Sequence, residues 1–106
     1  MALTERVPVV GGLAYIENIR SLPQSFTVAL SAETGNRYFP HAIAVLAGSG
    51  KVGYVAPEIA GHFYDAIRAS TSPITCPARR ASPSDHDTSG VELLLDMSGV
   101  AASDPA

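Results

Sequence analysis

The segment from Asn36 to Phe63 constrains the fold more than any other part of the chain. Within it, residues 42–47 are apolar at every position, which is typical of a strand that is covered on both faces. A Gly-Ser-Gly turn at 48–50 leads into a second predicted strand, Lys51–Val55, so the two strands should form a tight hairpin. Pro57 suits the first position of a helix. The sequence therefore predicts a central β-hairpin that is followed directly by a helix.

The rest of the chain supplies further short elements around this hairpin. Alternating or β-branched runs predict additional strands at 7–10, 25–33, 74–78 and 91–97. Pro77 favours an edge position for its strand. Apolar residues at helical spacing predict one short helix that ends before Pro23 and a second from Pro57 to about Ala69. Short strands in this number with two short helices indicate a mostly β (α+β) fold, a small and mostly antiparallel barrel.

Length and composition indicate one folded domain. The chain has 106 residues, of which 46% are apolar and 16% charged, and a chain of this length buries roughly 65% of its extended surface in a single core. We expect a flexible lead at 1–6, the barrel domain at 7–98 and a flexible tail at 99–106. No run approaches the roughly 20 apolar residues of a membrane span, so no membrane association is expected.

The charge balance and the single cysteine narrow the functional classes. Seven Lys and Arg against ten Asp and Glu give a formal net charge of −3. No basic stripe is present, so nucleic acid would be bound weakly or through a small pocket. Cys76 has no second cysteine to pair with, and the first residues lack the basic and apolar blocks of a secretion signal. Both features predict a cytoplasmic protein.

Several short patterns suggest catalysis or metal binding but lack the required spacing. Residues 48–51, Gly-Ser-Gly-Lys, resemble a phosphate-binding loop, yet they join two strands, and Val52 follows the lysine in place of Ser or Thr. Ser49 lacks the context of a nucleophile elbow. Candidate metal ligands fall in unrelated segments, at His41, His62, His86 and Cys76. We therefore expect a non-catalytic domain without a metal or another cofactor.

Aromatic residues flank the predicted hairpin. Tyr38 and Phe39 precede its first strand, and Tyr54 lies near the end of its second. One interpretation is an exposed platform on which nucleobases stack. The other is that Phe39 and Tyr54 close one end of the barrel core, with the tyrosine hydroxyl satisfied at the rim. The sequence leaves both interpretations open, although the tendency of aromatic side chains to be buried favours the second.

Two segments of the chain resemble the HIRAN domain family. Residues 36–45, Asn-Arg-Tyr-Phe-Pro-His-Ala-Ile-Ala-Val, are similar to the family segment Asn-Pro-Tyr-Asp-x-Asn-Ala-Ile-x-Val. Residues 50–60, Gly-Lys-Val-Gly-Tyr-Val-Ala-Pro-Glu-Ile-Ala, resemble the family's Gly-x-x-Val-Gly-Tyr/His-Leu segment and the helix start after it. The segments that begin at Val9, Cys76 and Val91 resemble the opening and closing strands of stand-alone bacterial members. The resemblance spans about residues 7–98.

The resemblance implies a six-stranded antiparallel barrel similar to the oligonucleotide-binding fold. Eukaryotic members are attached to helicases that remodel DNA at stalled forks, and there the domain holds a single-stranded 3′ DNA end. The terminal base stacks on aromatic rings, and the 3′-hydroxyl meets a carboxylate. Matching positions imply Asn36, Tyr38 and Tyr54 as site residues in this chain, with Tyr15 as an aromatic residue after the first strand.

Three positions depart from the family pattern. Phe39 stands where the family has Asp, and a phenyl ring does not accept the hydrogen bond of a hydroxyl as a carboxylate does. His41 replaces the family Asn, and Pro57 stands where some DNA-binding members carry a Lys that contacts phosphate. These differences favour base stacking over recognition of a 3′-hydroxyl.

Two functions are therefore predicted. The first is a non-catalytic module that binds single-stranded DNA or DNA ends by aromatic stacking, with Arg37, His41 and Lys51 as polar or charged partners. Its expected site residues are Tyr15, Asn36, Arg37, Tyr38, Phe39, His41, Lys51 and Tyr54. The alternative is a protein-interaction or adaptor domain of the same fold that has lost 3′-end recognition, with a partner such as a helicase or a nuclease. Fold alone does not separate the two functions.

Overall fold

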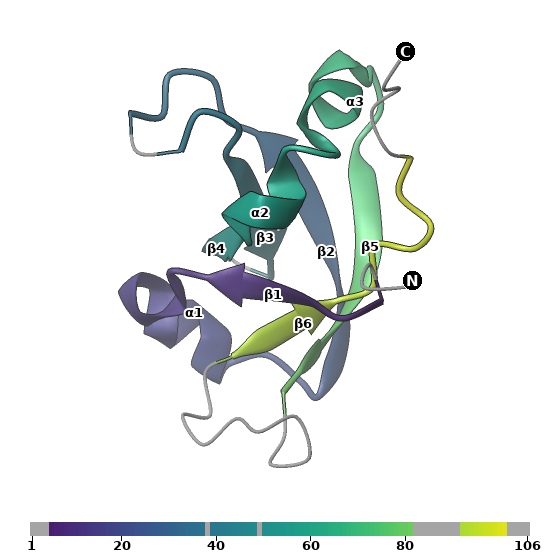
Figure 1. The fold of residues 1–106 in the computed structure, drawn as a ribbon. Helices are drawn as coiled ribbons and strands as arrows, with labels where there is room; N and C mark the ends of the chain where they lie inside the picture. The colour runs from purple at the N-terminus through teal and green to yellow at the C-terminus, as the bar shows by residue number, and fades with distance from the viewer. Residues whose placement is uncertain (1–4, 38, 49, 82–91, 102–106) are drawn as a thin grey trace.

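A computed structural model describes residues 5–37, 39–48, 50–81 and 92–101 of the chain. Within these ranges the strands are β1 (Val7–Val10), β2 (Ser25–Ala32), β3 (Ile43–Ala47), β4 (Gly50–Val55), β5 (Ile74–Arg80) and β6 (Leu93–Leu95). The helical elements are a 3-10 turn, η2 (Gly12–Tyr15), and three short α-helices, α1 (Ile16–Arg20), α2 (Pro57–Ala60) and α3 (Tyr64–Ala69). Figure 1 shows α1 beside the β1 end of the barrel and α3 at the opposite end.

The strands form one closed antiparallel barrel in the order β1-β4-β3-β2-β5-β6, and β6 returns to pair with β1 (Figure 1). At the closing seam Val7 pairs with Leu95 and Pro8 with Leu94. Closure leaves no strand without a neighbour on each side, which removes the exposed edges of an open sheet. The predicted fold class, a small six-stranded antiparallel barrel that is mostly β, is confirmed.

Alternation along the strands places one apolar row inside the barrel. On β2 the buried residues are Val28 and Leu30, with Phe26 packed against them, as the sequence predicts. The same core contains Cys76 from β5, which is 4% exposed, and Leu95 from β6, which is fully buried. The outward-facing residues of β2, β3 and β4 are thereby free to form a surface site.

The β3–β4 hairpin is the predicted one, although Ser49 of its turn lies outside the described residues. Gly48 takes a φ of 56°, a left-handed conformation that glycine adopts without strain. The register of the pair shifts between Val45 and Leu46, and such a bulge increases the local twist of the strand. Gly53 on β4 lies so close to β1 that a Cβ atom there would come within 2.6 Å of the Val10 carbonyl oxygen.

The second predicted helix, Pro57 to Ala69, is two helices. α2 ends at Ala60 and α3 begins at Tyr64. Between them His62 N–H donates to the Ile59 carbonyl and Phe63 N–H to the Ala60 carbonyl, both at 3.0 Å. These bonds span three residues, tighter than the α-helical four, and Phe63 then leaves the helical region with a φ of −122°. The apolar spacing correctly predicted helical structure on both sides of this turn, but it did not indicate that the chain changes direction here.

Strand β5 is not at an edge, because it pairs with β2 on one side and β6 on the other. The Pro77 carbonyl accepts a hydrogen bond from Asp96 N–H at 2.9 Å. On an antiparallel strand the N–H and C=O of one residue face the same neighbour. The N–H group that Pro77 lacks would therefore face Asp96. Because Asp96 lies immediately beyond the last residue of β6, the pairing of β5 with β6 does not need this hydrogen bond.

The predicted chain ends are described only in part. Of the expected lead at 1–6, residues 5 and 6 are described and exposed. Of the expected tail at 99–106, Val100 packs against the core and donates its N–H to the Met97 carbonyl at 3.0 Å. Strand β5 continues to Arg80, two residues beyond the predicted end at 78, and residues 82–91 lie outside the described ranges. Among the described helices none is long and apolar enough to cross a membrane.

Candidate functional site

A small pocket lies between the β2–β3 loop, β4 and α2. Its volume is about 90 Å³. The residues that line it are Phe39, Pro40, His41, Ala42, Tyr54, Val55, Pro57 and Ala60. These described lining residues include no Asp, Glu, Lys or Arg, so the walls consist of aromatic, proline and aliphatic surface with one imidazole. A flat, uncharged group is the kind of ligand that such walls accommodate.

The β2–β3 loop is folded by its own polar groups. Glu33 N–H donates to the Ala42 carbonyl at 2.8 Å, which joins the two ends of the loop. Gly35 takes a φ of 84°, and the Oδ1 atom of Asn36 accepts a hydrogen bond from Phe39 N–H at 3.0 Å. Asn and Gly favour turns for these reasons, namely side-chain bonding to the nearby backbone and access to positive φ. The loop sequence thus fixes where Phe39 stands.

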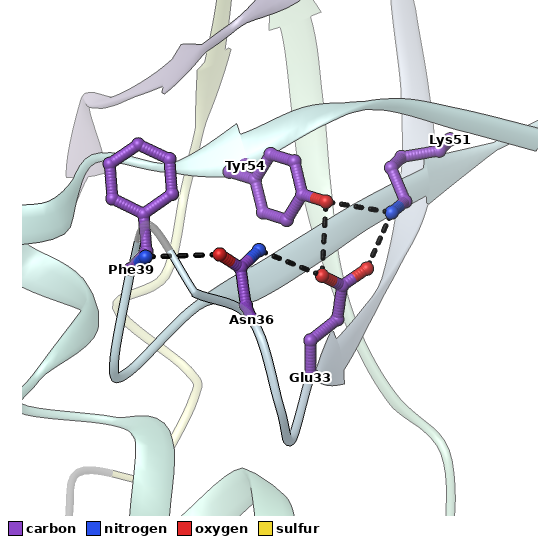
Figure 2. Close-up of polar contacts among 5 residues, drawn as sticks. All are labelled: Glu33, Asn36, Phe39, Lys51 and Tyr54. Carbon is purple, nitrogen blue, oxygen red and sulfur yellow. Dashed lines mark hydrogen bonds and ion pairs between the residues drawn. The ribbon is translucent and has the colours of Figure 1, made fainter.

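Tyr54 reaches the pocket from the outer face of β4. Its Cα pairs with Val10 on β1 and with Ala44 on β3, so its backbone is held from both sides. The Phe39 and Tyr54 rings lie 6.1 Å apart between centroids and are tilted by 44°. Both side chains are partly exposed, and Figure 2 shows the two rings side by side. They form the aromatic wall of the pocket, with neither ring sealed in the core.

A polar network adjoins the rings, with the Glu33 carboxylate at its centre (Figure 2). The Lys51 ammonium donates to Glu33 Oε2 and, at 2.8 Å, to the Tyr54 hydroxyl. The Tyr54 hydroxyl in turn donates to Glu33 Oε1 at 3.0 Å. The side-chain amide of Asn36 donates to the same Oε1 at 3.2 Å. The network ties the β2–β3 loop to β4 and holds the Tyr54 ring by its hydroxyl.

The network fixes the protonation state of its members at neutral pH. The hydrogen bond from Lys51, together with those from Asn36 and Tyr54, holds the pKa of Glu33 below its ordinary 4.5 in spite of burial. The same pairing raises the pKa of Lys51 above its ordinary 10.5. Lys51 lowers the pKa of Tyr54, but burial and the Glu33 carboxylate outweigh it, so the pKa of Tyr54 is raised. Glu33 and Lys51 are therefore charged, and Tyr54 is neutral.

Helix α3 supports the site from behind. The Tyr64 hydroxyl donates to the Glu33 carbonyl at 3.1 Å, and the Tyr64 side chain is only 6% exposed. The His41 ring meets the Tyr64 ring edge-on, with 5.2 Å between centroids. Since edge-to-face aromatic pairs are favourable, this contact orients the imidazole at the mouth of the pocket.

The structure brings most of the expected site residues together. Phe39, His41 and Tyr54 line the pocket, and Asn36 and Lys51 belong to the network beside it. Arg37 is exposed on the same loop and has no partner among the described residues.

One described residue of the expected site, Tyr15, is not part of this arrangement. Tyr38, another expected site residue, lies outside the described residues. Tyr15 is on η2 and is partly buried. The ring pairs found within the described ranges are Phe39–Tyr54 and His41–Tyr64, and Tyr15 belongs to neither.

Glu33 and Tyr64 were missed by the sequence analysis. The available signal for Glu33 was the alternation of β2, which puts Ser31 and then Glu33 on the outward face. The missing information was the arrangement of β2, β3 and β4, which brings the Glu33 carboxylate within hydrogen-bonding distance of the Lys51 and Tyr54 side chains. For Tyr64 the signal was weaker, because its place on α3 depends on the turn that separates α2 from α3.

Other hollows in the described surface are larger but less suited to a specific ligand. Their volumes are about 290, 360 and 440 Å³. None of the three is lined by more than one aromatic side chain. Within the described ranges no group of three or more His, Cys, Asp or Glu side chains is placed to hold a metal ion. The pocket at the ring pair is therefore the candidate site.

Comparisons of the chain with protein-family models, with curated proteins and with solved structures give no match. The assignment of a function therefore rests on the residues and geometry described above.

Proposed function

We propose that this protein is a non-catalytic nucleic-acid-binding module that takes the exposed base of a single strand, or of a DNA end, against the Phe39 and Tyr54 rings. The observation that carries the proposal is the partly exposed ring pair, 6.1 Å apart, at the mouth of an uncharged pocket. Each base that stacks on an aromatic ring contributes about 1–3 kcal/mol. A base held in this way would be bound modestly and with little sequence preference.

The charge distribution supports stacking as the main contribution. The net charge of −3 leaves no general attraction for phosphates. Arg37 is exposed on the loop that carries Phe39, and we assign to it the contact with the backbone of a bound strand. His41 at the pocket mouth adds a polar edge that can meet a base or a sugar hydroxyl.

The proposal agrees with the resemblance to HIRAN domains, in which aromatic rings hold the end of a DNA strand. On that basis, the ligands are single strands and 3′ ends of the kind that arise in DNA repair. The same proposal places the protein in the cytoplasm, in keeping with its single cysteine.

The direct test is fluorescence anisotropy with labelled single strands that carry a free or a blocked 3′ end, at about 50 mM salt, where phosphate contacts are strongest. We expect the wild type to bind and Tyr54→Leu or Phe39→Leu to bind roughly 5- to 150-fold more weakly, since each removes one stacking face. Tyr54→Phe is the matched control, because it keeps the ring and loses only the hydroxyl. Equal binding by Tyr54→Leu and Tyr54→Phe would refute the stacking site, and an effect of blocking the end would identify end recognition.

A second function is a protein-interaction or adaptor domain with the same pocket. It is favoured by the pairing of Lys51 with Glu33, which removes a cation from the site, and by the two prolines in the pocket wall. Such a pocket would take an apolar or proline side chain of a partner such as a helicase or a nuclease. Absence of strand binding at about 50 mM salt would favour this function over the first.

A further inference from the structure

Lys51 is the cation that lies against the aromatic wall. Its Nζ is 4.7 Å from the centroid of the Tyr54 ring. In a site that stacks a base on this ring, an ammonium at that position would be expected to contact the phosphate next to the base. The sequence predicts this kind of role for Lys51, as a charged partner of the ligand.

The structure gives the Lys51 ammonium a different partner. It donates to the Glu33 carboxylate and to the Tyr54 hydroxyl, and the Lys51 and Glu33 side chains are only 27% and 28% exposed. Two of the three N–H donors of the ammonium are therefore already used. The opposite charge is supplied from within the site.

Glu33 is also held firmly in this position. Its carboxylate accepts hydrogen bonds from Asn36 and Tyr54 in addition to Lys51 (Figure 2). Its backbone is bonded at both ends, through N–H to Ala42 and through C=O to the Tyr64 hydroxyl. A carboxylate fixed by this many contacts does not swing away when a ligand approaches.

We infer that Glu33 is a specificity-determining residue of the pocket: it neutralises Lys51, and so excludes a phosphate from the Tyr54 side of a stacked base. A phosphate that approached Lys51 would meet the Glu33 carboxylate at contact distance, with no net attraction to offset the repulsion. The pocket then selects bases whose Tyr54 side carries no phosphate. The inference rests on the proposed function. It adds that Glu33 restricts where a bound strand can carry a phosphate, which the ring pair alone does not do.

The test is the salt dependence of strand binding by the wild type and by Glu33→Gln. Gln keeps the size and the hydrogen-bonding oxygen of the side chain but removes the negative charge, so Lys51 becomes available to a phosphate. For single strands each phosphate contact adds about 0.7 to the slope of log affinity against log salt. We expect Glu33→Gln to bind more tightly at 50 mM salt and to show a slope steeper by about 0.7. Between 50 and 200 mM salt this is an additional loss of roughly 2.6-fold.

Two controls separate this effect from a general change in charge. Glu58→Gln removes the same charge from an exposed residue of α2 that does not contact Lys51, and it should leave the slope unchanged. The double variant Glu33→Gln with Lys51→Met should return the slope to the wild-type value. Glu33→Ala repeats the measurement should the Gln variant fail to fold, with circular dichroism as the check on folding.

The outcomes distinguish the two proposals. If the wild type binds and Glu33→Gln has the same slope, or if the double variant stays steep, the inference about Glu33 is wrong while the proposed function stands. If neither the wild type nor the Glu33 variants bind, both are wrong. If only the Glu33 variants bind, with a slope that depends on Lys51, the proposed function is wrong for the wild type, while the exclusion of phosphate by Glu33 is supported.

Discussion

A single carboxylate organises the polar side of the ring pair. Glu33 accepts hydrogen bonds from Lys51 and Tyr54, which both lie on β4, and from Asn36 in the β2–β3 loop. Because hydrogen bonds to charged groups contribute more than neutral ones, this residue stabilises the site as well as setting its charge. Its ionisation should therefore be visible in the stability of the protein.

We predict that Glu33→Gln lowers the free energy of unfolding by about 1 kcal/mol at pH 7, and that this difference from the wild type shrinks as the pH falls below about 4.5. The pKa of Glu33 is lower in the folded chain than its ordinary 4.5. The stability that it contributes is therefore complete above about pH 4.5 and is lost as the pH falls through the folded value.

Urea unfolding of both proteins between pH 3 and 7 measures this difference. Glu58→Gln, an exposed residue, serves as the comparison and should show no such pH dependence. A difference between wild type and Glu33→Gln that stays constant down to pH 3 would contradict the role assigned to the ionised carboxylate.

The site residues that sequence reasoning found are those with local signals. Phe39 and Tyr54 flank a recognisable hairpin, and Asn36 sits in a turn that needs its side chain. For Glu33 the local alternation indicates only an outward-facing side chain, because its partners Lys51 and Tyr54 lie two strands away on β4. The local sequence pattern shows which face of the sheet a side chain lies on. The pairing between strands determines which residues it contacts.

At the scale of elements, the β4 strand depends on a glycine. Gly53 has a φ of 150°, and a Cβ atom there would lie 2.5 Å from Val9 Cγ1 and 2.6 Å from the Val10 carbonyl oxygen. The close approach of β4 to β1 follows from the bulge in the β3–β4 pair and the tight curvature of a small barrel. Tyr54, the next residue, is oriented by this contact.

We predict that Gly53→Ala destabilises the protein by about 2–4 kcal/mol. The added methyl group must displace the backbone of β1, and the alanine must adopt a φ that is unfavourable for it. Denaturant unfolding followed by circular dichroism gives the value. Gly61→Ala is the matched control: Gly61 has a φ of −58° and open space around it, so the change should be neutral or stabilising by up to about 1 kcal/mol. Equal effects at the two glycines would show that β4 has room to move away from β1.

The helices were less predictable than the strands. Apolar spacing correctly marked Phe63 and Ile67 as core residues, but it could not separate α2 from α3. The two patterns are identical on a continuous helix and on two helices joined by a tight turn. Gly61, a poor helix former, was the local indication of the break.

At the scale of the whole molecule, the barrel is completed by a strand of three described residues. Leu93, Leu94 and Leu95 of β6 are all buried and join β1 to β5. The overall fold could be predicted because a barrel follows from the number, length and alternation of the strands. The closing pair could not, since it joins the first and last strands and has no local signal.

We predict that Leu95→Ala lowers the free energy of unfolding by about 2–5 kcal/mol, the usual cost of removing a fully buried leucine side chain. Leu46→Ala, on the partly exposed outer face of β3, removes the same atoms and should cost about 1 kcal/mol or less. Thermal unfolding of the two variants compares them directly. A cost at Leu95 no greater than that at Leu46 would mean that β6 contributes little to the core.

The buried thiol of Cys76 is a native reporter of local opening of the barrel. The side chain faces the interior, and burial together with Asp96 raises its pKa to about 11, while alkylating reagents react with the thiolate. Modification of the Cys76 thiol at pH 8 therefore requires a local opening of the barrel. The rate of modification reports how often the barrel opens, without an engineered label. Ligand binding at the ring pair should stabilise the closed barrel and so slow this reaction, although the ligand does not contact the sulfur atom.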